Sequence, residues 1–349
     1  MTTRARTTTL KDVASLTGLS VGIVSMALAD DPRVAVATRV AVLRAAQELD
    51  YVPNSAARAL RVQRLGAIAV VVPHSSQHVF SHPYFSEVLQ GISEVLEQHD
   101  FTLVLSTSRR EQDEDNAYTK ILRGRRADGV IVVSAAIGDR NIQRLASSGY
   151  PVVFLGRGVD LRITAVGVDD LGGAEQAVGH LVGLHQRRRI AHITGPLAHQ
   201  SAVDKLTGYR AALETHGLAF DEALVVEGDY SQESGARACA QLLDQGVAFN
   251  ALFAANDEMA SGALQILRRK GVHVPRDVAI VGYDNVQLAG LLQPPLTTVH
   301  QPMAELGHLA AERLLALLAK DPPEPSRVEL PTRLVIRESC GCSEADTTT

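Results

Sequence analysis

The stretch LKDVASLTGLSVGIVSMALAD, residues 10–30, decides how the N-terminal part of the chain folds. Its apolar residues recur at helical spacing before and after Gly18, and glycine tolerates the positive φ that a tight turn between helices needs. Ser20 is a natural N-cap for a second helix over residues 21–28, and a third amphipathic helix is expected over residues 38–49. Two short helices, a glycine turn and a closing third helix are typical of a helix-turn-helix. The same pattern also suits a three-helix bundle with no role at DNA.

The charge of the chain is unevenly distributed. Residues 1–64 hold nine Lys and Arg against five Asp and Glu and so carry a net +4, and the overall charge of −5 leaves −9 for the other residues. A basic head on an acidic body indicates that the head meets phosphate and that the body does not. The second helix would then enter the major groove of DNA with its N-terminus first.

A short alanine-rich segment, residues 53–64, follows the head. Asn54 can cap a helix here, and alanine is the best helix former, but about seven residues are too few for a helix that is stable alone in water. We therefore expect this segment to order only on a partner surface. Leucine is among the side chains that wedge between base steps in the minor groove, so Leu60 is a candidate wedge, with Arg58 and Arg61 in reach of phosphate.

From Gly66 onward the pattern changes to an alternation of apolar strands and amphipathic helices. Such alternation predicts parallel sheets that are covered on both faces by helices, and two sets of units predict two similar lobes. Ligands in these folds bind beyond the carboxyl ends of the strands, here in the cleft between the lobes. The predicted strands cover residues 67–72, 102–106, 130–134 and 152–155 in the first set, and 190–194, 224–227, 251–254 and 278–281 in the second.

The predicted fold class is therefore α/β, with an all-α helix-turn-helix head and a hinge helix before a two-lobed core of parallel sheets. We expect the head over residues 1–52, the hinge over 53–64, the core over 65–342 and a polar tail over 343–349. Within the core, the first lobe is expected over about 65–163 and 292–325, and the second over about 164–291 and 326–342.

Motifs along essentially the whole chain resemble the lactose-repressor/galactose-repressor (LacI/GalR) family. They include TLKDVA at residues 9–14, YVPN at 51–54, ARAL at 57–60, NDEMA at 256–260 and VGYDN at 281–285. The resemblance implies a cytoplasmic transcriptional repressor, not an enzyme, with a core like a periplasmic sugar-binding protein. It further implies a homodimer on a palindromic operator of double-stranded DNA. A small-molecule effector, a sugar or related metabolite bound between the lobes, would modulate the affinity for that operator.

The resemblance also implies which residues contact DNA, and two of them depart from the family pattern. Met26 stands where Arg is common, so the bidentate guanine contact of an Arg is absent, and Gly22 offers no side chain. We expect sparse, apolar base reading, with phosphate contacts, DNA shape and the Leu60 wedge supplying more of the specificity. The candidate DNA-binding residues are Thr9, Ser20, Val21, Gly22, Ser25, Met26, Arg33, Asn54, Ala57, Arg58, Leu60 and Arg61.

In the core, the resemblance places carboxylate, amide and aromatic side chains against the effector. Asp284 and Asn256 would face the ligand at strand ends, although both could instead cap helices. Lys205 stands where the family usually has a ligand-binding Arg, and it is a point charge rather than a planar fork, unless it is simply solvated. The candidate effector-binding residues are Tyr84, Phe85, Arg157, Lys205, Tyr230, Asn256 and Asp284.

Two other classes of protein fit the sequence less well. A solute-binding receptor would suit the two-lobed core, but it leaves the basic head unexplained, and no secretory signal is visible. An α/β enzyme would need a nucleophile or acid–base motif, and no nucleophile elbow and no intact dinucleotide or phosphate loop occurs at a strand–helix junction. We therefore expect no cofactor. The longest apolar stretches have the length of strands, so we also expect no membrane partner.

No metal site is expected from the sequence. His74, His78 and His82 are spaced by four, but prolines bracket them and residues 77–81 suggest a loop rather than a helix. The sequence CGC at residues 340–342 has no second Cys or His pair nearby in the sequence, which favours a plain thiol pair. An odd total of three cysteines suits a reducing cytoplasm rather than a disulfide framework.

Overall fold

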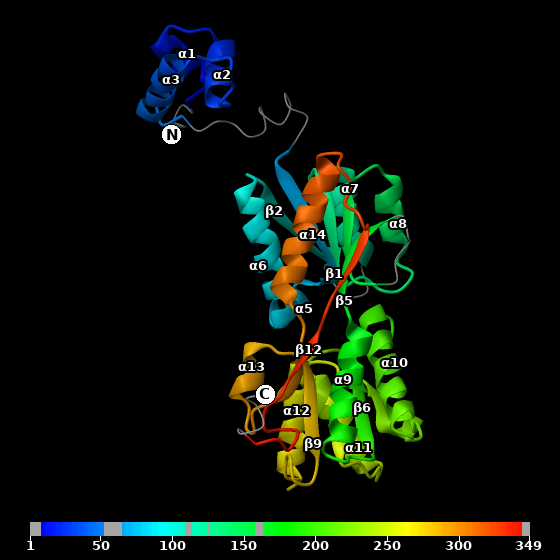
Figure 1. Cartoon of the computed structure of the whole chain (residues 1–349). Helices are drawn as coiled ribbons and strands as arrows, with labels where there is room; N and C mark the ends of the chain where they lie inside the picture. Colours follow the sequence, from blue (N-terminus) through cyan, green and yellow to red (C-terminus); the bar gives the residue numbers. More distant parts are fainter. Residues whose placement is uncertain (1–7, 52–64, 109–113, 125, 158–162, 344–349) are drawn as a thin grey trace, which may run out of the picture. The chain divides into compact units, whose positions relative to one another are not determined.

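The computed structural model describes residues 8–51, 65–108, 114–124, 126–157 and 163–343. The chain divides into two compact units, Met1–Leu65 and Gly66–Thr349, which are described separately below (Figure 1). The predicted hinge, residues 53–64, lies outside the described residues, as does the tail from residue 344 onward.

The described part of the first unit, residues 8–51, contains three helices, α1 (Leu10–Thr17), α2 (Val21–Leu28) and α3 (Val36–Glu48), which confirms the predicted helix-turn-helix. Gly18 ends α1 with a φ of 68°, as a tight turn requires. Ser20 caps α2, because its hydroxyl oxygen accepts a hydrogen bond from the backbone N–H of Ile23 at 3.3 Å. The helices enclose a small apolar core of Val13, Ala14, Val24, Ala27, Val34, Val42, Ala45 and Ala46.

The second unit contains two six-stranded sheets, one in each lobe. In the first sheet the order is β11-β5-β4-β3-β1-β2, and every neighbouring pair of strands is parallel. In the second sheet the order is β12-β10-β9-β8-β6-β7, and only β12 runs antiparallel to its neighbour. The first sheet comprises β1 (Ala67–Ser75), β2 (Thr102–Ser108), β3 (Gly129–Val133), β4 (Val152–Leu155), β5 (Thr164–Val168) and β11 (Arg327–Leu330). The second comprises β6 (Ile190–Thr194), β7 (Val225–Glu227), β8 (Ala251–Ala254), β9 (Ala279–Asp284), β10 (Thr297–His300) and β12 (Arg333–Val335).

The predicted boundaries between the lobes differ from the structure. Strand β5 pairs with β4, and β11 pairs with β5, so both belong to the first lobe and not to the second. Strand β10 pairs with β9 and belongs to the second lobe. The chain therefore crosses between the lobes after β5, after β10 and after β11. An apolar strand of four or five residues carries no mark of the sheet edge that will accept it, so spacing alone could not place these crossings.

Helices cover both faces of each sheet (Figure 1). In the first lobe, α6 and α14 pack on one face and α7 and α8 on the other; in the second, α11 and α12 pack on one face and α9 and α10 on the other. Their bounds are α6 Pro83–Gln98, α7 Glu114–Gly124, α8 Arg140–Ser147, α9 Asp170–Gly183, α10 Gln200–Thr215, α11 Gln232–Asp244, α12 Asp257–Arg269 and α14 Met303–Leu318. The described part of the lobes also contains the short helices α5 (Ser76–Ser81) and α13 (Gln287–Leu291) and the 3-10 helix Glu222–Leu224.

In each lobe, a glycine of one helix packs closely against a backbone carbonyl of a second helix. A Cβ added at Gly91 of α6 would lie 1.9 Å from the carbonyl oxygen of Ala304, at the start of α14. A Cβ added at Gly262 of α12 would lie 2.0 Å from the carbonyl oxygen of Gln232, at the start of α11. Both helix pairs thus pack backbone against backbone, which leaves no room for a side chain at these glycines.

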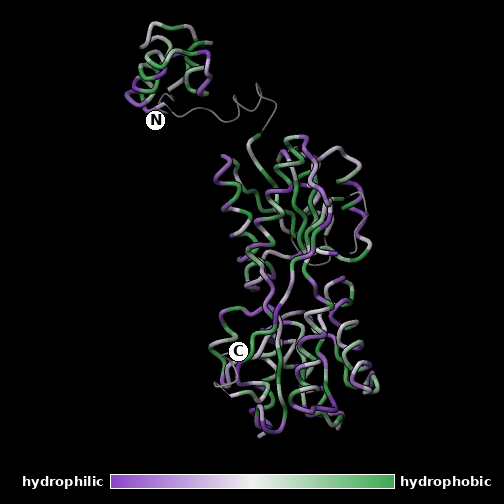
Figure 2. Tube along the Cα trace, in the orientation of Figure 1, coloured by the Kyte–Doolittle hydropathy of each residue, from purple (hydrophilic) through white to green (hydrophobic). Residues whose placement is uncertain are grey.

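Apolar residues gather along the strands at the centre of each lobe, and polar residues cover the outer faces of the helices (Figure 2). Within the described ranges, no single helix is both long and apolar enough to cross a membrane. Helices α1 and α2 together meet the length and composition, but they bend by 105° at their junction.

A histidine is buried in the core of the second lobe. The ring of His192 on β6 stacks between those of Tyr209 and Phe253, with centroids 5.1 and 4.7 Å away. Its Nδ1–H donates to the carbonyl oxygen of Phe253 at 3.0 Å, and Nε2 has no hydrogen-bond partner in the part of the chain that the structure describes. Burial lowers the pKa of His192 to about 4, so the core holds it neutral.

The unfolded chain should therefore bind a proton at residue 192 that the native chain does not bind between about pH 6.5 and pH 4. The free energy of unfolding should fall with decreasing pH in this window, by up to about 1.4 kcal/mol per pH unit from this residue. His192→Phe keeps the stacked ring and removes the titration. Urea unfolding at several pH values should show that the free energy of unfolding depends less on pH in the variant than in the wild type. If the two proteins showed the same pH dependence, His192 would be excluded as a source of acid sensitivity.

Candidate effector pocket and DNA-binding face

A pocket lies between the two lobes, at the carboxyl ends of the parallel strands. Arg157 follows β4, Asn256 follows β8, and Asp284 is the last residue of β9, so the strand ends of both sheets contribute side chains to it. The empty space of the pocket, with its open mouth included, is about 1070 Å³. All the predicted effector-binding residues line it: Tyr84, Phe85, Arg157, Lys205, Tyr230, Asn256 and Asp284.

Lys205 of α10 is the buried cation of the pocket. Its side chain is only 4% exposed, and its ammonium donates to the carboxylate of Asp170, the first residue of α9. The ammonium also lies 4.1 Å from the ring centroid of Tyr283. Burial opposes the charged form, but the Asp170 and Asp284 carboxylates raise the pKa of Lys205 above its ordinary value. The alternative of a solvated lysine is therefore wrong, and Asp170 is a pocket residue that the sequence analysis missed.

Asn256 both caps a helix and faces the pocket, the two roles between which the sequence did not decide. It is the N-cap of α12, because its Oδ1 accepts from the backbone N–H of Met259 at 2.9 Å. Its Nδ2 donates to the carbonyl oxygen of Tyr230 and to the carboxylate of Glu258, each at 2.9 Å. The residue thus faces the pocket while it fixes the backbone of Tyr230.

Asp284 caps no helix, because the N-cap of the following helix α13 is Val286. The side chain of Asp284 is buried in the pocket wall, and Gln301 donates its amide N–H to it. Its φ of 100° is strained for a residue other than glycine, and such strain is concentrated at functional sites. Burial, together with the Glu258 and Asp257 carboxylates, raises the pKa of Asp284 well above its ordinary value.

Aromatic rings form the apolar walls of the pocket. Tyr230 has a φ of 67°, and its ring lies over Gly195, where a Cβ would come within 2.1 Å of the ring carbon Cζ. Glycine is therefore required after β6 for the ring to occupy this position. The rings of Tyr84 and Phe85 are 5.3 Å apart in an edge-to-face arrangement, and Phe85 also belongs to the core of the first lobe.

Histidines line one side of the same pocket. The expected loop at residues 77–81 is wrong, because residues Ser76–Ser81 form helix α5. The ring centroid of His78 lies 4.6 Å from that of His74 and 4.2 Å from that of His82, and His199 of the second lobe lies 5.3 Å from His74. Burial and the neighbouring histidines lower the pKa of His78 to about 3, and burial lowers that of His199 to about 4. Both rings are therefore neutral near pH 7.

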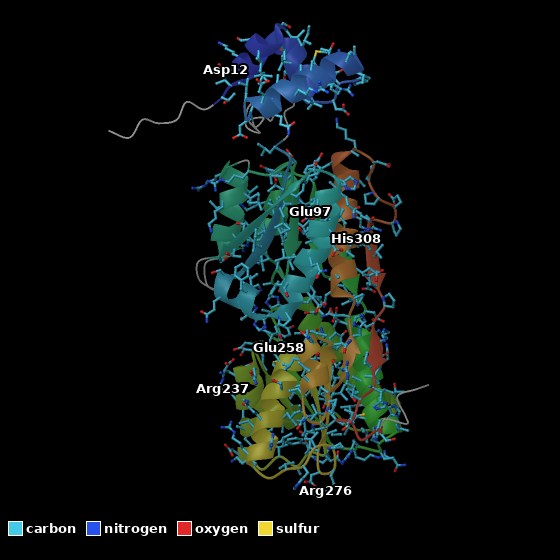
Figure 3. The ribbon with its side chains drawn as sticks, turned by 90° about the vertical axis from the view of Figure 1, so that its left-hand side faces the viewer. Asp12, Glu97, Arg237, Glu258, Arg276 and His308 are labelled. Atoms are coloured by element: carbon cyan, nitrogen blue, oxygen red, sulfur yellow. The ribbon has the colours of Figure 1, made fainter. Side chains whose placement is uncertain are left out.

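Several contacts cross from one lobe to the other beside the pocket. The backbone N–H of Ile137 donates to the carbonyl oxygen of Ala198 at 2.7 Å. Nε of Arg157 lies 3.7 Å from the carboxylate of Asp204, and Nδ1 of His82 lies 3.6 Å from that of Glu258. Figure 3 shows Glu258 at the level where the lobes meet. Movement of one lobe against the other must change these contacts.

The N-terminal turn of α2 is accessible at the surface of the head. Val21 is 41% exposed and Ile23 is 39% exposed, with the exposed Gly22 between them. Ser25 is only 6% exposed, so the structure removes this predicted DNA contact from the face, and Met26 packs partly against the core of the head. Ile23 was not predicted, although its place in the first turn of a recognition helix could have indicated it.

Two arginines of the head pair with neighbouring aspartates. Arg33 pairs with Asp31 at 2.7 Å, and this hydrogen bond lowers the pKa of Asp31 to about 2. Arg39 pairs with Asp30, and both the backbone and the hydroxyl of the exposed Thr9 donate to Asp12. The predicted contacts Asn54, Ala57, Arg58, Leu60 and Arg61 lie outside the described residues.

The positive excess of residues 1–64 comes from segments next to the three helices. Residues 8–51 contain four basic and five acidic residues. The remaining basic residues are Arg4, Arg6, Arg58, Arg61 and Arg64. Residues 8–51 therefore carry no positive excess of their own.

A helix-turn-helix and a two-lobed core with a ligand pocket at its strand ends together define a DNA-binding regulator that senses a small molecule. Residues 9–54 match the family of bacterial regulatory proteins called the lacI family, and residues 178–340 match the periplasmic binding protein-like domain. The chain is 39% identical over 341 residues to the HTH-type transcriptional regulator CelR of Thermobifida fusca, covering 96% of this chain and 99% of CelR. This chain belongs to the LacI family and is a transcription regulator, not an enzyme.

Two solved structures agree with this assignment. The complex of the transcriptional regulator CelR with cellobiose matches with a TM-score of 0.75 and 37% identity, over 95% of this chain and 99% of that one. The lac repressor dimer bound to operator and the anti-inducer ONPF matches with a TM-score of 0.85 and 29% identity, over 96% and 99%. The predicted fold class and the predicted DNA-binding role are confirmed.

Proposed function

We propose that this protein is a cytoplasmic, homodimeric repressor that binds a palindromic operator, and that a neutral disaccharide of the cellobiose class is its effector. The observation that carries the choice of effector is the make-up of the pocket. Tyr84 and Tyr230 supply apolar ring faces, while the buried Asp284 supplies a carboxylate beside them. A sugar presents an apolar face of C–H groups for stacking and hydroxyls that donate to a carboxylate.

The charge of the pocket favours a neutral ligand over an anionic one. Lys205 is already paired with Asp170, and Arg157 lies 2.6 Å from the carboxylate of Glu329, so an anion would have to compete for both cations. His78 and His199 are neutral near pH 7 and offer no further positive charge. The similarity to the CelR–cellobiose complex supports a disaccharide in particular.

Effector binding would act on DNA through the two lobes. A sugar that bridges the cleft changes the separation of the lobes and with it the contacts of Ile137 and His82 across the cleft. In a two-fold symmetric dimer this change alters the spacing of the two heads, and the operator has the same two-fold symmetry. The coupling is reciprocal, so operator and effector must change each other's affinity by the same factor, typically about 5–150-fold.

The head would recognise DNA mainly through the phosphate backbone and the shape of the DNA. The exposed face of α2 presents Val21, Gly22 and Ile23, which can contact thymine methyl groups but cannot donate to guanine. Phosphate contacts from Arg58 and Arg61 and the wedge of Leu60 would then contribute most of the affinity and specificity.

Selection of genomic fragments by the purified protein, with footprinting at two salt concentrations, tests the proposal. We expect a short palindrome whose affinity falls steeply with salt, by about 0.9 logarithmic units per tenfold salt for each phosphate contact. Cellobiose should then change operator affinity, and a monosaccharide should serve as the control. If no DNA sequence were enriched, the proposal of operator binding would be contradicted. If a palindrome were enriched but its affinity changed with none of the disaccharides tested, only the proposed class of effector would be contradicted.

A further inference from the structure

Two histidines and two cysteines from distant parts of the chain meet in the second lobe. His180 lies in the last turn of α9 and His185 just after this helix, while Cys340 and Cys342 follow β12. One potential ligand atom from each of the four residues lies within 4.8 Å of all the others. Both thiols are buried and the two imidazoles are half-buried, so the group is largely shielded from solvent.

We propose that His180, His185, Cys340 and Cys342 bind one tetrahedral Zn²⁺ ion that fastens the C-terminal segment to helix α9. Zinc sites with four protein ligands typically use this set of two nitrogens and two sulfurs. A closed site of this kind has no open coordination position, so its role is structural and not catalytic.

The distances between the ligand atoms support a tetrahedron. With Zn–N of about 2.0 Å and Zn–S of about 2.3 Å, two nitrogens should lie about 3.3 Å apart, and a nitrogen and a sulfur about 3.5 Å apart. The two Nε2 atoms are 3.2 Å apart, and Sγ of Cys342 lies 3.4 Å from Nε2 of His185 and 3.7 Å from that of His180. Three ligands thus already have the spacing that the ion needs, and the ligand atom of Cys340 lies within 4.8 Å of each of them.

The surroundings of the four residues suit metal ligation. The hydroxyl of Thr297 donates to Sγ of Cys340 at 3.1 Å, a bond that would stabilise a thiolate. Gly341, with a φ of 111°, turns the chain between the thiols, and a Cβ there would come within 3.2 Å of the ring of His185.

Binding of the ion would replace protons. As a thiol, Cys340 also donates to the carbonyl oxygen of Arg337 at 3.4 Å. Ligation of Zn²⁺ by two thiolates and two neutral imidazoles releases one proton from each thiol to solvent, and no electron is transferred. The competing state is a disulfide between Cys340 and Cys342, which would require an oxidant.

The position of the site gives it a consequence for the fold. Helix α9 begins at Asp170 in the effector pocket and reaches His180 about 15 Å further on. The ion would join this end of the helix to the segment after β12, about 155 residues later in the sequence, and would restrict the unfolded chain accordingly. Cys340 and Cys342 favoured a plain thiol pair in the sequence, because only the fold brings them beside His180 and His185.

The test uses the full-length chain without a histidine tag, reduced, stripped with a chelator and then dialysed against Zn²⁺. We expect one zinc per chain by mass spectrometry of the metal, and Co²⁺ should give the thiolate charge-transfer and intense d–d absorption of a tetrahedral site. In His185→Asn and in Cys342→Ser, competition with a chromophoric chelator should show at least about 100-fold weaker binding. His216→Asn, a neighbouring histidine outside the group, and Cys239→Ser, the third cysteine, should bind as the wild type does.

Three outcomes would overturn the proposal. The reduced, folded protein could bind no Zn²⁺. It could bind Zn²⁺ equally well in His185→Asn and Cys342→Ser, which would place the ion elsewhere. Its intact mass, measured before reduction on protein purified without oxidant, could show a Cys340–Cys342 disulfide in place of metal. His185→Asn leaves both buried thiols in place, so this variant keeps the test valid if Cys342→Ser does not fold.

Discussion

Replacing Lys205 with methionine is expected to destabilise the two-lobed core by about 3–5 kcal/mol, the typical cost of removing one partner of a buried ion pair. Lys205 is 4% and Asp170 is 5% exposed, so the substitution leaves a carboxylate in the protein interior with no cation beside it. Methionine keeps most of the side-chain volume, which separates the loss of charge from the loss of packing. Urea unfolding at pH 7.5 measures the change.

The pH dependence of this variant provides a second test. An unpaired, buried Asp170 should take up a proton more readily than in the unfolded chain, so its folded pKa lies above its unfolded pKa. Stability is then lost as pH rises, and the deficit of Lys205→Met should be smaller at pH 5 than at pH 7.5. Adding Asp170→Leu should recover most of the loss, because replacing both partners with apolar groups is often neutral.

An exposed ion pair in the same lobe provides the matched control. Lys270 lies 3.1 Å from Asp244, and these side chains are 54% and 67% exposed. Exposed pairs contribute little, so Lys270→Met should change the free energy of unfolding by less than about 1 kcal/mol. If Lys205→Met lost no more than this control, the pair with Asp170 would not hold the pocket together.

Local patterns were sufficient to predict most elements of the fold. Helix α2 has the predicted bounds, because its cap and its turn are encoded by Ser20 and Gly18, within three residues of its start. Strands β4, β6 and β8 also have their predicted bounds. It was not predictable which of the two sheets would contain β5, β10 and β11, because the pairing of a strand with a particular sheet is decided by packing across the whole chain. Helix α5 was missed because the flanking prolines suggested a loop, whereas Pro83 begins helix α6 at a position where proline is favoured.

The candidate site was predictable to the extent that each residue follows a strand or matches a family motif. Asn256 and Asp284 lie at strand ends, so their place at the pocket follows from the topology of parallel sheets. Asp170 and His199 were missed, because their roles depend on Lys205 and His74, which are remote in the sequence. The family resemblance placed Ser25 on the DNA-binding face, but Ser25 is buried in the head, and a motif does not show which side of a short apolar helix is accessible.

Asp284→Asn is expected to weaken disaccharide binding by about 10–100-fold, as the loss of hydrogen bonds to a charged group would predict. The shape of the side chain is kept, and the amide oxygen can still accept from Gln301, so the stability of the core should change by less than about 1 kcal/mol. Calorimetric titration with cellobiose measures the affinity. Asp244→Asn, an exposed carboxylate of the same lobe, is the control and should bind as the wild type does.

The release of protons on sugar binding distinguishes an Asp284 that contacts the sugar from one that only supports the fold. Burial and nearby carboxylates raise the pKa of Asp284, whereas sugar hydroxyls that donate to it favour the ionised form. Binding should therefore release protons and tighten as pH rises, and Asp284→Asn should lose this dependence. Because coupling is reciprocal, the variant should bind its operator normally without sugar and respond only at higher sugar concentrations. An unchanged titration would remove Asp284 from the site, and weakened operator binding in the absence of sugar would assign it to the fold instead.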